Sequence, residues 1–263
     1  MKPSSAINSV HVAHLGGAEY AAVAAYLREP RPQGRRSYVP YIGAVFTLDD
    51  IECSVSFQDE CLLPVKDRER PRLLLVMSNA HPESIKNGMF HTAESGVADL
   101  WNDLRAAGLF SGDRGDLTSP ESLRDWCLEV KYDSPFCIGF ACYWIFPTFH
   151  PKHLRELFRP EVEPPGFRNA DERFKRVVKD WQPRAIIGFN GEVFECLTGR
   201  SSRVYTKRLR EETLDAAYHL DSVTYPVFQT FPAAWRYDSN ADGFRRESLR
   251  RIASRLRAVG IGC

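Results

Sequence analysis

The 263-residue sequence lacks an excess of charge of either sign. Lys and Arg number 35 against 34 Asp and Glu, which gives a formal net charge of +1. A nucleic-acid-binding protein with this balance must gather its positive charge on one face, because the whole molecule is not a polycation. Arginines do cluster late in the chain, between Arg203 and Arg257. Such a run is also typical of the solvated face of a helix.

The sequence also lacks the spacings of common metal sites and membrane segments. No two of the seven cysteines are arranged as C-x-x-C, so we expect no zinc knuckle, iron–sulfur loop, bound metal or cofactor. No apolar run approaches the ~20 residues that a membrane-spanning helix needs. The first residues do not have the charged-then-apolar pattern of a signal peptide. We therefore expect a cytoplasmic protein with unpaired thiols and no membrane partner.

Short, almost continuously apolar segments predict strands that are buried on both faces. They are residues 72–77, 136–146, 184–189 and 226–231. Between them apolar residues recur with the spacing of a helix face, for example in the stripe that begins at Val97. Strands that alternate with helices predict an α/β domain, with a short, mainly parallel four-stranded sheet sandwiched between helices.

We assign this domain to residues 71–263. Residues 1–70 are expected to form a helical and loop extension that packs on it. Within the extension, a helix at about residues 16–28 is followed by a loop rich in proline and arginine at residues 28–37.

The residues that directly follow each strand are the most informative, because open parallel sheets bind ligands at the carboxyl ends of their strands. The first strand is followed by a polar loop that begins Ser78-Asn79-Ala80-His81. Asn190 follows the third strand at a turn into a helix, where backbone N–H groups suit a phosphate. Trp235 and Arg236 follow the last strand. Each loop also has a structural reading, since Asn favours turns and a single Trp usually closes a core.

These segments together resemble the motifs of the uracil-DNA glycosylase superfamily. Its mismatch-specific members carry V-G-x-N-P after the first strand, and residues 76–80 here read V-M-S-N-A. An aromatic residue follows at Phe90, and the third strand with its G-x-x-A-like ending corresponds to residues 181–194. The final motif, usually H-P-S, reads F-P-A at residues 231–233. The likeness extends in order over roughly residues 70–257.

The chain departs from the family pattern at several positions. Met77 stands for the usual Gly of the first motif, Ala80 for its Pro, and Phe231 for the His of the last motif. The Asn that reads the pyrimidine edge is not evident after the second strand. The resemblance therefore rests on order and spacing.

The resemblance implies a metal-independent, monomeric DNA repair enzyme. It would hydrolyse the N-glycosidic bond of uracil in single- or double-stranded DNA, release uracil and leave an abasic site. Asn79 would hold the attacking water. His81 would donate a hydrogen bond to the leaving base, with His91 and Arg236 as the other candidates for this role.

The resemblance also implies the residues that contact the substrate. The base would be flipped out of the stack, and Phe90 would pack against its face. Trp235 would fill the space that the base vacates. The residues implied in uracil binding are Ser78, Ala80, Phe90, His91 and Asn190, and those implied in DNA binding are Ala234, Trp235 and Arg236.

Two other functions fit the same residues. One is a non-catalytic protein of the same fold that binds damaged or single-stranded DNA, because a motif without its Gly and His suits that role as well. The other is a hydrolase of free nucleosides or nucleotides, since Asn79 and Phe90 also suit a free nucleobase.

Overall fold

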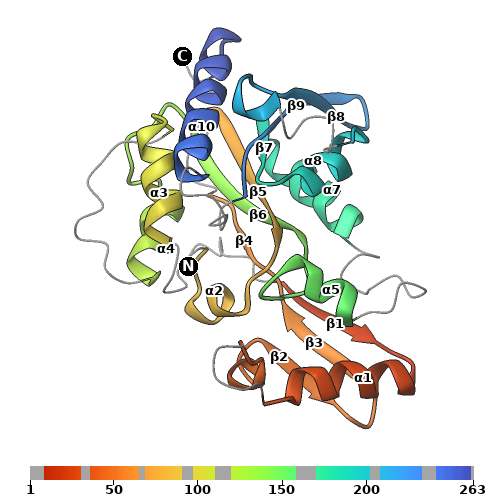
Figure 1. Ribbon diagram of the computed structural model, residues 1–263. Helices are drawn as coiled ribbons and strands as arrows, with labels where there is room; N and C mark the ends of the chain where they lie inside the picture. The colour runs from red at the N-terminus through yellow and green to blue at the C-terminus, as the bar shows by residue number, and fades with distance from the viewer. Residues whose placement is uncertain are drawn as a thin grey trace.

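A computed structural model describes most of the chain. The described residues are 9–30, 36–64, 69–90, 97–109, 120–157, 170–201, 208–232 and 241–261. Within these ranges the chain forms eight α-helices, a three-stranded sheet and a six-stranded sheet (Figure 1). The predicted α/β class is confirmed.

The larger sheet has the order β4-β6-β5-β7-β9-β8. The bounds are β4 (Cys61–Leu62), β5 (Arg72–Asn79), β6 (Cys137–Trp144), β7 (Ala185–Gly188), β8 (Asp215–Leu220) and β9 (Val223–Gln229). Its centre consists of β6, β5, β7 and β9, which overlap the predicted apolar segments and pair in parallel. The sheet is nevertheless mixed and six-stranded rather than four-stranded, because antiparallel β4 and β8 extend its two edges. Neither has a long apolar run: β4 has two residues, and only one of the six residues of β8 is buried.

Helices cover both faces of this sheet. On one face lie α3 (Val97–Ala106), α4 (Pro120–Leu128) and α10 (Ala241–Ala258), and on the other lie α7 (Ala170–Trp181) and α8 (Gly191–Thr198) (Figure 1). The short helices α2 (Pro82–Asn87) and α5 (Pro151–Leu157) lie at the carboxyl ends of the parallel strands. Because β5 lies between its two successors β6 and β7, the connections diverge beside its carboxyl end, where such folds bind ligands.

The N-terminal region contains a second sheet as well as a helix. Its strands are β1 (Val10–His14), β2 (Phe46–Asp49) and β3 (Ser54–Gln58), in the antiparallel order β1-β3-β2. It lies with α1 (Gly17–Arg28) beyond the carboxyl ends of the main sheet (Figure 1). We expected only helix and loops here, because β1 and β2 alternate between exposed and covered residues and give no apolar run. The two sheets share one core, in which Phe57 contacts Phe146.

A buried ion pair fixes the junction between the two sheets. Asp59 lies between β3 and β4 with a fully buried carboxylate, and its Oδ2 is 2.7 Å from Nη2 of Arg173 on α7. His11 of β1 approaches the same oxygen at 3.2 Å. Arg173 also donates from Nη1 to the carbonyl of Cys142 at 2.7 Å. The pair therefore joins β1, β6 and α7 around the start of β4.

Replacing Arg173 with Met should lower the free energy of unfolding by about 3–5 kcal/mol, because the Asp59 charge would stay buried without its main partner. Urea denaturation measures this. The double variant Arg173→Met/Asp59→Asn should recover part of the loss, since it also removes the charge. A loss below about 1 kcal/mol, the range of exposed pairs, would contradict this account of the junction.

Candidate functional site

The carboxyl end of β5 projects past its neighbour β7 and forms the base of the candidate site. Pairing with β7 ends at Val76, whereas pairing with β6 continues to Asn79, which is opposite Trp144. Ser78 and Asn79 are half-buried. The polar residues predicted after this strand therefore lie where β5 extends beyond β7 and forms a step in the edge of the sheet. The connections to β6 and β7 diverge at the same point.

The side chain of Asn79 is held by the loop that follows β6. Its Nδ2 donates to the carbonyl of Thr148 at 2.6 Å and lies 3.0 Å from the Thr148 hydroxyl. Its Oδ1 accepts from the Ser78 hydroxyl at 3.1 Å. The donor side of the amide is thus used to hold two strand ends together. The carbonyl oxygen has a second lone pair and can accept one more hydrogen bond, for example from water.

His81 precedes α2 and contacts two other parts of the chain. Its backbone N–H donates to Oε2 of Glu60 at 3.2 Å, and its Nε2 lies 3.0 Å from Nη1 of Arg36. Because a guanidinium has only donors, Nε2 is the acceptor in this contact. In this arrangement Nε2 does not donate to a ligand, which is the role that the resemblance implies for this histidine.

The remaining predicted site residues are distributed over three environments. Ala80 is fully buried, and its backbone bridges the carbonyl of Trp144 and the N–H of Thr148. Phe90 is buried against Phe140, with ring centroids 5.6 Å apart. Asn190 caps α8, because its Oδ1 accepts from the N–H of Val193 at 2.7 Å.

Some predicted residues cannot be compared with the structure. His91, Ala234, Trp235 and Arg236 lie outside the described residues. Phe231, which stands for the His of the last family motif, is described. It is buried with Leu209 and Leu214 in a separate small apolar cluster.

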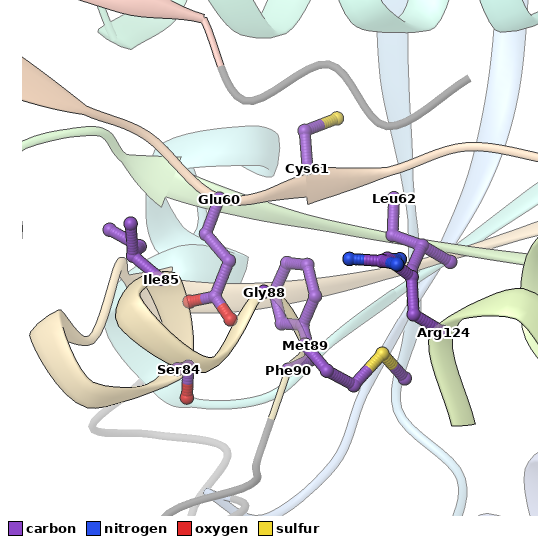
Figure 2. Close-up of a pocket in the computed structure, with 9 residues that line it drawn as sticks. All are labelled: Glu60, Cys61, Leu62, Ser84, Ile85, Gly88, Met89, Phe90 and Arg124. Atoms are coloured by element: carbon purple, nitrogen blue, oxygen red, sulfur yellow. The ribbon is translucent and has the colours of Figure 1, made fainter. Parts of the chain in front are cut away.

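A cavity of about 50 Å³ lies between β4, α2 and the segment 88–90. Figure 2 shows the Phe90 ring at its centre, with the Glu60 carboxyl and the Arg124 guanidinium extending into the same region. Leu62, Ile85 and Met89 supply the apolar walls. The cavity is linked to the strand end with Asn79, since His81, two residues further along, binds Glu60 through its backbone.

Glu60 is the residue of this cavity that sequence reasoning missed. Burial raises the pKa of its carboxyl to about 8; the negative charge of Asp59 adds to this effect, and hydrogen bonds from His81 and Cys142 oppose it. The carboxyl is therefore mostly protonated at neutral pH. The sequence has an acidic pair directly before an apolar Cys-Leu-Leu, but a strand of two residues is too short to give a periodic signal.

Basic and aromatic side chains surround the carboxyl ends of β5 and β6. We define the basic rim as Arg36, Lys86, Lys152, Tyr41 and Phe149. The Arg36 guanidinium lies 5.6 Å from the centre of the Phe149 ring, and the Lys86 ammonium lies 5.6 Å from that of Tyr41. Positive charge interleaved with aromatic rings is typical of surfaces that bind single-stranded nucleic acid.

The late arginines on the C-terminal half of α10 lie elsewhere. Arg250, Arg251 and Arg255 line a groove of about 390 Å³ on the C-terminal half of α10, near the end of the sheet opposite to α2 (Figure 1). Arg250 donates to the carbonyl of Ala106, and Arg251 to the carbonyls of Leu209 and Arg210. Several of these arginines thus hold neighbouring elements instead of only facing solvent.

Comparison with protein-family models and with the sequences of curated proteins finds no match. Within the described ranges, no group of three or more His, Cys, Asp or Glu residues is arranged to hold a metal ion. In the same part of the chain, every helix is too short or too polar to cross a membrane.

Replacing Glu60 with Gln should flatten the dependence of stability on pH. Because folding raises the pKa of this carboxyl from 4.5 to about 8, its contribution to stability is complete below pH 4.5 and is lost as the pH rises through about 8. The variant should gain about 4 kcal/mol over the wild type between pH 5 and pH 9. Urea denaturation at both pH values measures the gain. If the difference in free energy of unfolding between variant and wild type is the same at both pH values, the Glu60 carboxyl is exposed to solvent.

Proposed function

We propose that this protein is a DNA repair glycosylase that hydrolyses the N-glycosidic bond of uracil in DNA and leaves an abasic site. The observation that supports this most is the combination of Phe90 in the wall of a cavity with Asn79 at the adjoining strand end. These are the two residues for which the sequence resemblance implies base stacking and water positioning.

The reaction breaks the bond between the base nitrogen and the sugar carbon, and the electron pair leaves on the base. Water supplies the oxygen that bonds to this carbon, and its proton is released to the departing base. The site must therefore hold a water, cover the face of the base and stabilise negative charge on its oxygen. We assign the water to the free lone pair of the Asn79 Oδ1 and the base face to Phe90.

Substrate DNA is proposed to lie across the basic rim. Phosphate contacts provide most of the affinity of nucleic-acid-binding proteins and carry little sequence information. Arg36, Lys86 and Lys152 are exposed and border the strand ends, whereas Arg250, Arg251 and Arg255 lie toward the opposite end of the sheet. This arrangement concentrates charge beside the cavity although the whole chain is nearly neutral.

A non-catalytic DNA-binding protein is the second candidate. The observation that favours it is the full use of the Asn79 amide nitrogen to hold Thr148, which gives this residue a structural role without any reaction.

Uracil-containing single- and double-stranded oligonucleotides test the proposal. Incubation with the purified protein should produce alkali-labile sites, including in the presence of EDTA. Binding of the oligonucleotides without such sites would favour the non-catalytic candidate. Release of uracil from deoxyuridine alone would favour a nucleoside hydrolase.

Replacing Asn79 with Ala should lower the single-turnover rate of uracil excision at least tenfold, because the attacking water loses its acceptor. Thr148→Val is the matched control, since it removes one hydrogen-bond partner of Asn79 but keeps the amide oxygen. The control should retain most of the rate. Equal losses in the two variants would mean that Asn79 acts only by holding the loop.

Replacing Lys86 and Lys152 together with Gln should weaken DNA binding equally for all sequences. The slope of log affinity against log salt concentration should decrease by about 1 to 2. The matched double variant Arg250→Gln/Arg255→Gln should leave both quantities close to wild type. Fluorescence anisotropy with a labelled oligonucleotide measures both quantities. A loss of affinity in the arginine variant but not in the lysine variant would mean that DNA binds at the groove on α10.

A further inference from the structure

We propose that Glu60 binds the nucleobase, donating a hydrogen bond from its Oε1 to a carbonyl oxygen of a base held in the cavity against Phe90. This inference rests on the proposed function and assigns to Glu60 the leaving-group donor that the sequence resemblance leaves without a residue. The cavity, the pairing of β4 and the hydrogen bonds of the carboxyl support it independently.

The pairing of β4 directs Glu60 into the cavity. Leu62 is opposite Phe140 in the antiparallel register, so both side chains lie on the face of the sheet that Phe90 covers. Glu60 precedes Leu62 by two residues, and alternation along the strand puts it on the same face. Asp59 takes the opposite face and pairs with Arg173. The same alternation therefore separates the acid that pairs with Arg173 from the one that lines the cavity.

The hydrogen bonds of Glu60 indicate which oxygen carries its proton. Both groups that reach the carboxyl approach Oε2: the His81 N–H at 3.2 Å and the Cys142 thiol at 3.9 Å. Oε1 is buried and has no hydrogen-bond partner among the residues that the structure describes. Two donors at Oε2 mark it as the carbonyl oxygen, which leaves the hydroxyl at Oε1. A buried hydroxyl without an acceptor calls for a ligand that provides one.

Among the described residues, no charged side chain around Glu60 is a cause that lowers the pKa of its carboxyl. Asp59, just before β4, opposes ionisation of the Glu60 carboxyl, and burial keeps the thiols of Cys61 and Cys142 neutral. Arg173 on α7 is compensated by Asp59. On the helix side, Arg124 of α4 lines the cavity without being a cause of the shifted pKa of Glu60, and His81 before α2 contributes its backbone N–H.

The chemistry of the site fits a neutral base with a carbonyl group. An ionised carboxylate only accepts hydrogen bonds and would repel a carbonyl oxygen, whereas a protonated one donates. The cavity has room for a few water molecules, which matches the edge of a six-membered ring. As the glycosidic bond breaks, negative charge grows on the carbonyl oxygen of uracil, so the same hydrogen bond strengthens in the transition state.

Two variants of Glu60 test the inference. Glu60→Leu removes the donor and should lower the single-turnover rate of uracil excision about 100-fold or more. Glu60→Gln keeps a donor of the same length and should lose less. The wild-type rate should fall as the pH rises through about 8, and the Gln variant should lack this decline. Melting curves of both variants at each pH identify any loss that comes from unfolding.

Equilibrium dialysis with radiolabelled uracil gives a readout that is independent of excision. Wild-type protein should bind uracil more tightly at pH 6.5 than at pH 9, and the Leu variant should bind at least tenfold more weakly at pH 6.5. Glu60-dependent uracil binding without excision by the wild type would overturn the glycosylase but retain the donor. Wild-type excision that is unchanged by Glu60→Leu would overturn the donor but retain the glycosylase. Absence of both activities would overturn both.

Discussion

The ion pair between Asp59 and Arg173 is the constraint on which the rest of the site depends. Burying two charges is costly, and the cost is offset here because Arg173 also donates to the carbonyl of Cys142 on β6. The pair fixes the chain just before β4, so that the next residue, Glu60, enters the opposite side of the sheet. One strongly polar contact on the α7 face thereby determines which acid lines the cavity on the other face.

The sequence was sufficient for the centre of the fold. Runs such as Leu73–Met77 and Ile186–Ile187 are apolar because both faces of β5 and β7 are covered, and this pattern is typical of buried strands. The edge strands and the N-terminal sheet have no such pattern, since β1 exposes alternate residues and β8 has only one buried residue. Their positions depend on pairing partners that are distant in the sequence, and local periodicity does not encode them.

The candidate site was predictable only in part. The sequence indicates that Ser78 and Asn79 follow a strand, and the structure puts them at the step in the sheet edge. The sequence does not reveal that the amide nitrogen of Asn79 donates to the carbonyl of Thr148. Nor does it reveal that Asp103 on α3 pairs with two of the late arginines, Arg245 and Arg246. The number of arginines in the sequence therefore suggests more positive surface on α10 than the structure has, and it does not indicate the basic rim.

The brevity of β4 has a consequence for dissecting the protein. Every residue of β6 is buried, and at one edge its backbone is covered by the two residues of β4 and the chain that leads into them. Cutting the chain at residue 71 would remove that cover and leave the most apolar strand of the sheet with unpaired backbone groups. Exposed, flat, apolar edges recruit further strands and lead to aggregation. The residues of β4 and the chain that leads into them thus protect this edge of the sheet, and the α/β layer is best handled together with them.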